Sequence, residues 1–182
     1  MEERTASKLI KIAITGPEST GKSRLAKELS EYYRTTWVPE CAREYLNKYG
    51  PSYTASDVEN IANAQLHREK QAEATAHGLL FYDTDLLVCQ IWMENAFGKS
   101  PQWLKEAVNS ATYHHTFLMN IDLPWQPDPL REHPDKRDFL FRWYERELIR
   151  ANRVYTVISG DGYQRTLQAI QEIGRIKTEQ LL

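Results

Sequence analysis

The sequence predicts an α/β fold in which a five-stranded parallel sheet lies between two layers of helices. Five short runs rich in β-branched and aromatic residues alternate with longer runs that have helical spacing. A glycine-rich loop directly follows the first of these runs. The chain has 182 residues, enough for one domain with a substantial core and too few for two ordinary domains. We therefore expect a single domain over residues 1–182.

The five expected strands are largely apolar over four to six residues each. They lie at residues 9–14, 35–38, 79–83, 116–121 and 154–158. Because helical segments connect successive strands, the strands should run parallel, with helices on both faces of the sheet. Ligands of such sheets bind beyond the carboxyl ends of the strands. Candidate functional residues are therefore expected at those ends.

Three helical segments have boundaries that the sequence marks. A long helix is expected between the second and third strands, with a capping box at residues 56–59 and Gly78 as its stop signal. Pro101 at a first helical position favours another helix after Ser100. Residues 135–150 have the composition of a further helix. Strands and helices thus alternate along the chain.

Residues 16–23 read Gly-Pro-Glu-Ser-Thr-Gly-Lys-Ser and fit the P-loop pattern of two glycines followed by Lys and a hydroxyl. An expected strand precedes this loop and strong helix formers follow it, as phosphate binding at a helix N-terminus requires. The amides of residues 19–23 and Lys22 are expected to hold phosphates, and Ser23 to ligate Mg²⁺. The predicted fold is therefore a P-loop NTPase three-layer sandwich. The residues expected at the nucleotide are Gly16, Pro17, Glu18, Ser19, Thr20, Gly21, Lys22, Ser23 and Arg24.

Composition and charge exclude several other classes. A net charge of −2 provides no basic footprint for duplex nucleic acid. No apolar run approaches the ~20 residues of a membrane helix, and the acidic start at residues 1–4 is unlike a signal peptide. Cys41 and Cys89 lack zinc-site spacing and are expected to be reduced structural thiols. We expect a cytoplasmic protein without nucleic-acid or membrane partners.

Residues suited to phosphoryl transfer follow several of the expected strands. This chemistry needs a base, a magnesium ligand and cations for the developing charge. Glu40 follows the second strand, Asp83 ends the third, and Arg131 and Arg137 come after the fourth. Solvated loop charges are the alternative interpretation of the two arginines.

Two more carboxylates have two interpretations each. Asp85 follows the third strand and is either a helix N-cap or a ligand. Glu44 follows the second strand and is either part of a helix surface or a ligand. The sequence leaves both alternatives open.

Four motifs in order resemble the ribosylnicotinamide kinase domain of NadR-type proteins. They are the loop at 16–23 followed by Thr35-Thr36, the segment Glu40-x-x-Arg43-Glu44, the strand end Asp83-Thr84-Asp85, and Trp125-x-x-Asp128-x-Leu130-Arg131. The resemblance runs from about residue 9 to the end of the chain. No helix-turn-helix or adenylyltransferase domain precedes it, so a stand-alone kinase domain is expected. Pro129 stands where the pattern often has Gly, which bears on the conformation of a lid at about residues 123–137.

The resemblance implies that ATP·Mg²⁺ phosphorylates the 5′-hydroxyl of nicotinamide riboside to give nicotinamide mononucleotide. Glu40 is the first candidate for the general base and Asp83 the second. Asp83 would also hold Mg²⁺ through water, together with Ser23. By analogy with other kinases of this fold, adenine is expected near residues 160–163, at Gly160 and Asp161. The cations expected to act in catalysis are Lys22 and, from a closing lid, Arg131 and Arg137.

The same resemblance implies an acceptor site for a small-molecule nucleoside. Arg43 would orient Glu40 or bind the ribose. The nicotinamide ring is cationic and favours an aromatic face, for which Trp125 is the first choice. Trp37 and Trp92 follow, with core positions as their alternative. The residues expected to bind the acceptor are Glu40, Arg43, Glu44, Asp85, Trp125 and Asp128.

Other classes of protein share parts of this pattern. A kinase for a deoxynucleoside or a nucleoside monophosphate would use the same chemistry. A regulatory GTPase is disfavoured because residues 47–50, Asn-Lys-Tyr-Gly, lack the Asp of a guanine-reading motif. A mechanical ATPase is disfavoured because the third strand ends in Asp-Thr-Asp and not Asp-Glu. A non-catalytic nucleotide-binding module would not turn ATP over when an acceptor is added. The oligomeric state stays open.

Overall fold

The computed structural model describes residues 9–179, and the expectation about residues 1–4 lies outside them. One parallel sheet with the strand order β2-β3-β1-β4-β5 confirms the predicted α/β three-layer fold. The strands are β1 (Ile10–Thr15), β2 (Trp37–Val38), β3 (Leu79–Asp83), β4 (His115–Met119) and β5 (Tyr155–Ile158).

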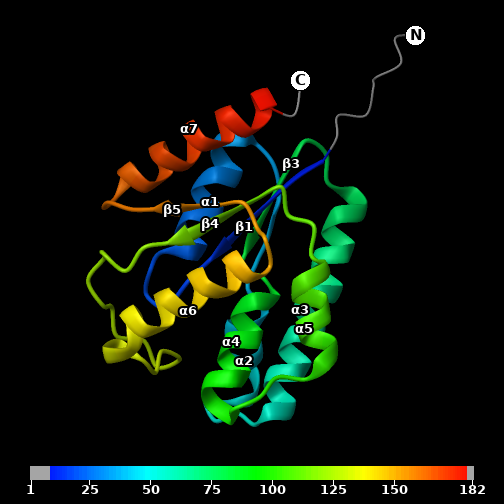
Figure 1. Ribbon diagram of the computed structural model, residues 1–182, viewed down its shortest axis with the longest axis vertical. Coiled ribbons are helices and arrows are strands. Elements are labelled where there is room, and N and C mark those ends of the chain that lie inside the picture. Colours follow the sequence, from blue (N-terminus) through cyan, green and yellow to red (C-terminus); the bar gives the residue numbers. More distant parts are fainter. Residues whose placement is uncertain (1–8, 180–182) are drawn as a thin grey trace.

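Helices cover both faces of the sheet (Figure 1). The helices α1 and α7 lie on one face, and α2 to α6 lie on the other. Among the described residues, no helix is both long enough and apolar enough to cross a membrane. The bounds are α1 (Lys22–Tyr33), α2 (Cys41–Tyr49), α3 (Ala55–Thr75), α4 (Leu86–Phe97), α5 (Gln102–Ser110), the short 3₁₀ helix η1 (Pro134–Lys136), α6 (Arg137–Arg150) and α7 (Tyr163–Glu179).

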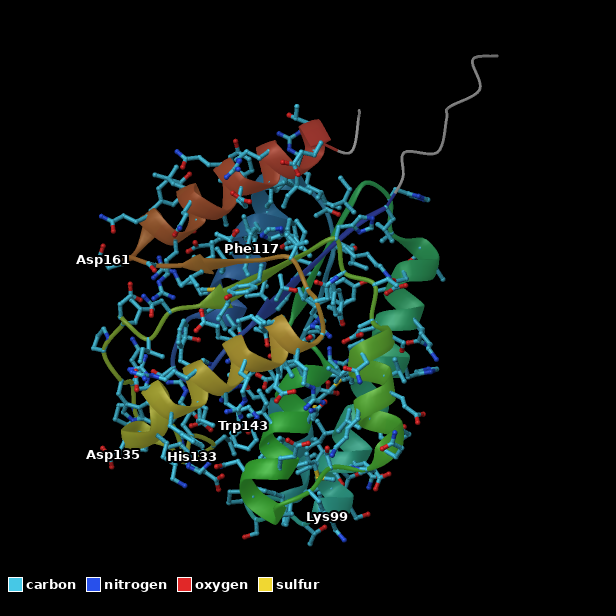
Figure 2. The ribbon with its side chains drawn as sticks, in the orientation of Figure 1. Lys99, Phe117, His133, Asp135, Trp143 and Asp161 are labelled. Atoms are coloured by element: carbon cyan, nitrogen blue, oxygen red, sulfur yellow. The ribbon has the colours of Figure 1, made fainter. Side chains whose placement is uncertain are left out.

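The sheet is buried on both faces, which explains its nearly continuous apolar strands. Ile12, Ile14 and Phe117 are fully buried and pack with α1 and α7. Figure 2 labels Phe117 among them. Alternate residues such as Leu118 pack on the opposite face with α2 to α6. Both cysteines are buried free thiols. The core therefore holds the carboxyl ends of β1, β3 and β4 side by side, at the edge where ligands are expected.

The start and end of α3 differ from the prediction. Thr54 is the N-cap, and it forms a reciprocal capping box with Asp57, so the box predicted at residues 56–59 is wrong. The Tyr45 hydroxyl also donates to Asp57 at 2.7 Å and holds the Asp57 carboxylate beside Thr54. At the other end α3 stops at Thr75. Gly78, with φ 76°, leads into β3 and does not terminate the helix.

The fourth strand ends at Met119, so the prediction that it continues through residues 120–121 is wrong. Asn120 turns the chain there, because its Oδ1 accepts the Ile121 amide at 2.8 Å. Its Nδ2 donates to the Ser159 hydroxyl at 3.0 Å. This contact ties the end of β4 to the end of β5 and frees the following residues to leave the sheet.

Candidate active site

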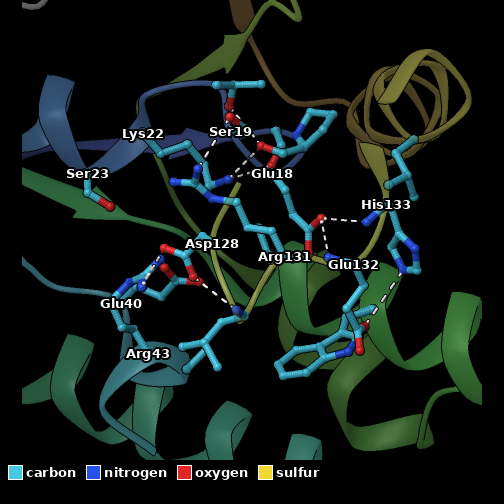
Figure 3. A pocket seen from close by; sticks show the side chains of 18 of the residues that line it. Glu18, Ser19, Lys22, Ser23, Glu40, Arg43, Asp128, Arg131, Glu132 and His133 are labelled. Carbon is cyan, nitrogen blue, oxygen red and sulfur yellow. Dashed lines mark hydrogen bonds and ion pairs between the residues drawn. The ribbon is translucent and has the colours of Figure 1, made fainter. Parts of the chain in front are cut away.

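A cavity of about 690 Å³ opens at the carboxyl edge of the sheet. Its walls come from the P-loop, from α2 and α4, and from residues 123–133 of the stretch predicted as a lid (Figure 3). We refer to residues 123–137 as the 123–137 segment. The predicted site residues that line the cavity are Gly16, Pro17, Glu18, Ser19, Thr20, Gly21, Lys22, Ser23, Arg24, Glu40, Arg43, Asp128 and Arg131.

The P-loop is tightly folded between β1 and α1. Gly16 has φ 134°, and a Cβ there would lie 3.1 Å from the Met119 carbonyl oxygen, so a side chain does not fit. The Thr20 hydroxyl donates to the Pro17 carbonyl at 2.8 Å. Lys22 Nζ donates to the carbonyls of Gly16 at 2.9 Å and Pro17 at 2.8 Å. The lysine thus spans the loop.

Burial lowers the pKa of Lys22, while the carboxylates of Glu40, Asp83 and Glu18 oppose this shift. A lysine between acidic groups and a loop of backbone amides is placed to exchange its carbonyl contacts for phosphate oxygens. Figure 3 shows Lys22, Ser23 and Glu40 at one end of the cavity and His133 at the other.

Asp83 is the last residue of β3 and is 2% exposed. Burial, followed by the nearby charge of Glu40, raises its pKa to about 6, and a hydrogen bond from Ser23 opposes the shift. Its Oδ1 is buried and has no hydrogen-bond partner among the residues that the structure describes. A carboxylate with a free buried oxygen beside a hydroxyl is a hard-oxygen donor pair of the kind that Mg²⁺ prefers. The residues present therefore fit the predicted Mg²⁺.

Glu40 occupies the N-cap position of α2, but its side chain does not cap the helix. It lines the cavity and is close enough to Asp83 to raise the pKa of that carboxyl. From the same helix, Arg43 donates to Asp128 at 3.0 Å. The second motif thus meets the fourth across the cavity.

Residues of the 123–137 segment bond directly to the P-loop. The Ser19 hydroxyl accepts the Gln126 amide at 2.9 Å and the Arg131 guanidinium at 3.4 Å. The Glu18 carboxylate accepts the amides of Glu132 and His133, both at 3.1 Å. The segment therefore lies over the P-loop, and Arg131 faces the cavity.

The end of the cavity away from Ser23 is aromatic and acidic. Tyr53 and Trp92 line it, and their rings meet edge to face with centroids 4.7 Å apart. The Tyr53 hydroxyl donates to Glu132 at 2.5 Å, and burial together with this carboxylate raises the pKa of Tyr53 to about 12. Asn95 and His133 hydrogen-bond at 2.9 Å and join α4 to the 123–137 segment.

Trp125 and Arg137 lie outside the cavity lining. The Arg137 guanidinium is 6.0 Å from the centre of the Trp125 ring, so the tryptophan already faces a cation of the protein itself. Arg137 donates to the carbonyls of Leu123 at 2.9 Å and Ser19 at 3.2 Å. The aromatic rings that do line the cavity are those of Trp92, which the sequence ranked below Trp125, and Tyr53, for which no motif gave a signal. Which ring faces an acceptor stays a prediction.

Asp85 and Glu44, which were expected to bind the acceptor, do not line the cavity, and each has a partner elsewhere. Asp85 is fully buried, accepts the Thr15 hydroxyl at 3.0 Å and forms a very short ion pair with Arg153. It sits at the N-cap position of α4, but its side chain makes no capping bond. Glu44 lies on the exposed surface of α2 and pairs with Arg68 at 2.7 Å.

Gly160 and Asp161 lie in the loop after β5, on the α7 side of the molecule (Figure 2). Neither lines the main cavity. The Gly160 amide donates to Asp122 at 2.6 Å, and its carbonyl accepts from Arg165 at 2.7 Å. A separate hollow of about 40 Å³ beside this loop is lined by Gly21, Arg24, Leu25, Glu28, Leu123, Gly162, Arg165 and Thr166.

Known proteins are similar to this chain in sequence or in fold. The AAA domain family matches residues 11–165. The trifunctional NAD biosynthesis/regulator protein NadR of Escherichia coli (strain K12) and that of Salmonella typhimurium are each 28% identical over 124 residues. These alignments cover 66% of this chain and 30% of each relative, so the chain corresponds to less than a third of their length. The predicted resemblance to NadR-type proteins is confirmed.

Solved structures have the same fold at low sequence identity. NadR in complex with NAD and AMP-PNP has a TM-score of 0.74 at 17% identity, covering 94% of this chain and 50% of that chain. NadR in complex with NR gives 0.73 at 17% identity, covering 94% and 52%. Deoxyadenosine kinase from M. mycoides with products dCMP and a flexible dCDP gives 0.70 at 16% identity, covering 91% and 100%.

Proposed function

The chain belongs to the AAA domain family, and from this premise we propose that it is a P-loop kinase. We propose that it transfers the γ-phosphoryl group of ATP to the 5′-hydroxyl of nicotinamide riboside. The observation that carries the proposal is that one cavity runs from the P-loop, with Ser23, to an aromatic, acidic end. Asp83 does not line this cavity but is buried beside Ser23, to which it is hydrogen-bonded. The P-loop end suits the phosphates of a nucleotide donor, and the aromatic, acidic end suits a cationic nucleoside.

The acceptor end suits a positively charged ring. Aromatic faces attract cations through their quadrupole, and a nearby carboxylate adds a charge of the opposite sign. Tyr53 and Trp92 supply the aromatic surface, and Glu132 supplies the carboxylate. The ion pair of Asp128 and Arg43 lies between the aromatic end and Glu40. Its polar groups would contact the hydroxyls of a ribose there. The 28% identity to NadR supports the same substrate class.

The phosphate end supplies cations and amides. Lys22 would leave the carbonyls of Gly16 and Pro17 to contact the β- and γ-phosphates. Arg131, which already reaches Ser19, would contact the transferring phosphoryl group. Phosphoryl transfer depends chiefly on positioning and charge stabilisation, so these contacts supply most of the expected rate enhancement.

The chemical step moves one phosphoryl group and one proton. The 5′-oxygen forms a bond to the γ-phosphorus while the bond from that phosphorus to the β–γ bridging oxygen breaks. Glu40 accepts the hydroxyl proton, and the products are nicotinamide mononucleotide and ADP. Ser23 and Asp83 would hold Mg²⁺, which when bound offsets charge on the phosphate oxygens.

We propose that the 123–137 segment acts as a lid that closes over bound substrates. Its bonds to Glu18 and Ser19 show how it contacts the P-loop. Closure would exclude water from the phosphoryl group and bring Arg131 onto it. We keep the loop after β5 as the proposed place for adenine. In that loop Gly162 lines the small hollow beside Arg24, and Gly160 and Asp161 precede it in the chain.

A second candidate is a kinase for a deoxynucleoside. The fold match to deoxyadenosine kinase, which extends over 100% of that chain, favours it. A screen of purified protein for ADP release separates the two, with nicotinamide riboside, deoxyadenosine, deoxycytidine and thymidine as acceptors. We expect nicotinamide riboside to give the largest kcat/KM. If none of these acceptors stimulated ADP release, the result would contradict a nucleoside kinase of either kind.

A further inference from the structure

Gln65 is a buried amide on α3 that reaches the backbone behind both candidate carboxylates. It is 1% exposed and does not line the cavity. Its Oε1 accepts the Cys41 amide at 3.0 Å, and its Nε2 donates to the Thr84 carbonyl at 3.4 Å. Because a backbone N–H only donates and a carbonyl only accepts, the side-chain amide has one orientation that satisfies both. Glu69 accepts a second bond from Nε2 at 3.3 Å.

At one end, Gln65 satisfies the start of α2. Cys41 is the first residue of this helix, and the amides of a first helical turn have no partner within the helix. The side chain of an N-cap residue reaches the amides of the second and third helical residues, so the Cys41 amide needs a different acceptor, which Gln65 supplies from inside the protein. Gln65 thus fixes the peptide that follows Glu40, whose own carboxylate makes no capping bond and lines the cavity.

At the other end, Gln65 holds the turn that follows Asp83. Thr84 has φ 74°, a left-handed conformation that is unfavourable for a β-branched residue. Its amide donates to the Ile14 carbonyl of β1 at 3.0 Å, and its carbonyl accepts from Gln65. The strained turn is therefore held from two sides, and the direction in which Asp83 leaves β3 is fixed with it.

We propose that Gln65 is a positioning residue that sets the orientation of Glu40 relative to Asp83. One side chain bonds to the peptide that follows Glu40 and to the residue that follows Asp83, so movement of one carboxylate is coupled to the other. The role rests on the proposed function, since it is useful only where these two carboxylates act together on Mg²⁺ and the acceptor hydroxyl.

Gln65→Met tests this role, because methionine keeps the length and the burial but loses both backbone contacts. We measure the affinity of Mn²⁺ in the presence of a non-hydrolysable ATP analogue, by electron paramagnetic resonance, and separately kcat and KM. Loss of the residues that orient metal ligands typically lowers metal affinity or activity by about 10–100-fold. We expect a Mn²⁺ Kd at least about tenfold higher, a kcat lower by a similar factor, and a KM for ATP within about threefold of wild type.

Thr156→Val is the matched control. It removes the 2.9 Å hydrogen bond between Thr156 of β5 and the buried His115 of β4. These strands form the edge of the sheet opposite to β2 and β3. It should lower the melting temperature while leaving the Mn²⁺ Kd and kcat unchanged. If Gln65→Met gives the Mn²⁺ Kd and kcat of this control within about twofold, the inference is overturned.

Gln65→Asn keeps the test decisive if Gln65→Met does not fold. Its side chain keeps a neutral amide but is one methylene shorter, so it cannot reach both the Cys41 amide and the Thr84 carbonyl. We expect its Mn²⁺ Kd to rise and its kcat at saturating metal to fall less than in Gln65→Met, and an unchanged Mn²⁺ Kd would overturn the inference. The Mn²⁺ measurement needs no acceptor. If the wild type were inactive with nicotinamide riboside and the Gln65 variants still raised the Mn²⁺ Kd, the proposed substrate would be contradicted. The role of Gln65 would then still stand.

Discussion

The Glu18 carboxylate in the P-loop accepts the backbone amide of His133 at 3.1 Å, across the mouth of the cavity. The same oxygen accepts the amide of Glu132 at 3.1 Å. A phosphate-binding loop and a segment more than a hundred residues later are thus joined by two charge-assisted hydrogen bonds. The contacts use backbone amides of the 123–137 segment, so they fix its path and not only a side chain.

Replacing Glu18 should loosen the 123–137 segment. In Glu18→Ala the amides of Glu132 and His133 lose their acceptor, and we expect their hydrogen exchange to accelerate. We also expect kcat/KM for ATP to fall by about 10–150-fold, since a bond to a charged group contributes about 1.5–3 kcal/mol. Glu31→Ala, on the exposed face of α1, is the control. Equal exchange at residues 132 and 133 in both variants would contradict the contact.

Lys22→Ala should abolish turnover without unfolding the protein. Within residues 9–179, its Nζ donates only to carbonyls of the P-loop, and its proposed role is to contact phosphates. Removing one preorganised electrostatic contact lowers kcat by about 100–1000-fold. Lys27→Ala, on the exposed surface of α1, should keep the wild-type rate. A Lys22→Ala variant with more than half of that rate and a normal melting temperature would argue against the P-loop assignment.

Glu40→Gln and Asp83→Asn should differ in their response to magnesium. Asp83 has the buried, unpartnered oxygen, so Asp83→Asn should raise the Mg²⁺ concentration needed for half-maximal rate. Glu40→Gln should lower kcat at saturating Mg²⁺, because it removes the proposed base. Initial rates over a Mg²⁺ titration check both. The reverse pattern would exchange the two roles.

Glu69 makes the stability of the fold depend on pH. Burial, and then the charge of Asp85, raise its pKa from 4.5 to about 8. Between these two values the folded protein keeps a proton that the unfolded chain has lost, so this group makes stability fall as pH rises and then level off above about 8. Glu69→Gln removes this dependence. Its melting temperature relative to wild type should be higher at about pH 9 than at about pH 5, by roughly 8–16 °C for ~4 kcal/mol. Parallel melting temperatures across this range would contradict the assignment.

Much of the fold is predictable from local patterns, because the P-loop and the apolar strands are contiguous in sequence. The carboxyl ends of β2 and β3 also place Glu40 and Asp83 together, since neighbouring parallel strands end at one edge. Pairings between distant residues are not visible in this way. Asp85 has its partner Arg153 on a segment 68 residues later, so its burial in an ion pair could not be predicted from the strand end alone.

The aromatic end of the cavity shows the same limit. Trp92 has the helical spacing of a core residue, and Tyr53 lies in an irregular segment without a motif. Only the packing of α4 beside that segment brings the two rings together. Trp125, in contrast, belongs to a recognisable motif but packs against Arg137. Motif membership thus drew attention to a segment that lines the cavity, but not to the two rings that line it.

Trp92→Leu should reduce selectivity for a charged acceptor. Leucine keeps an apolar surface but removes the quadrupole that attracts a cation, an effect of about 0.5–2 kcal/mol. We expect kcat/KM for nicotinamide riboside to fall about 2–30-fold more than that for thymidine or for the uncharged reduced riboside. Trp125→Leu should change the three acceptors by the same factor. If it is Trp125→Leu that alters the preference, the ring that faces the acceptor has been assigned wrongly.

The central claim is that the wild-type protein phosphorylates nicotinamide riboside, and competing acceptors in one reaction test it most directly. Equal concentrations of nicotinamide riboside, deoxyadenosine and thymidine are incubated with ATP and Mg²⁺, and the products are separated and quantified. The account predicts nicotinamide mononucleotide as the main product, in an amount matched by the ADP released. A main product of deoxyadenosine or thymidine monophosphate would contradict it.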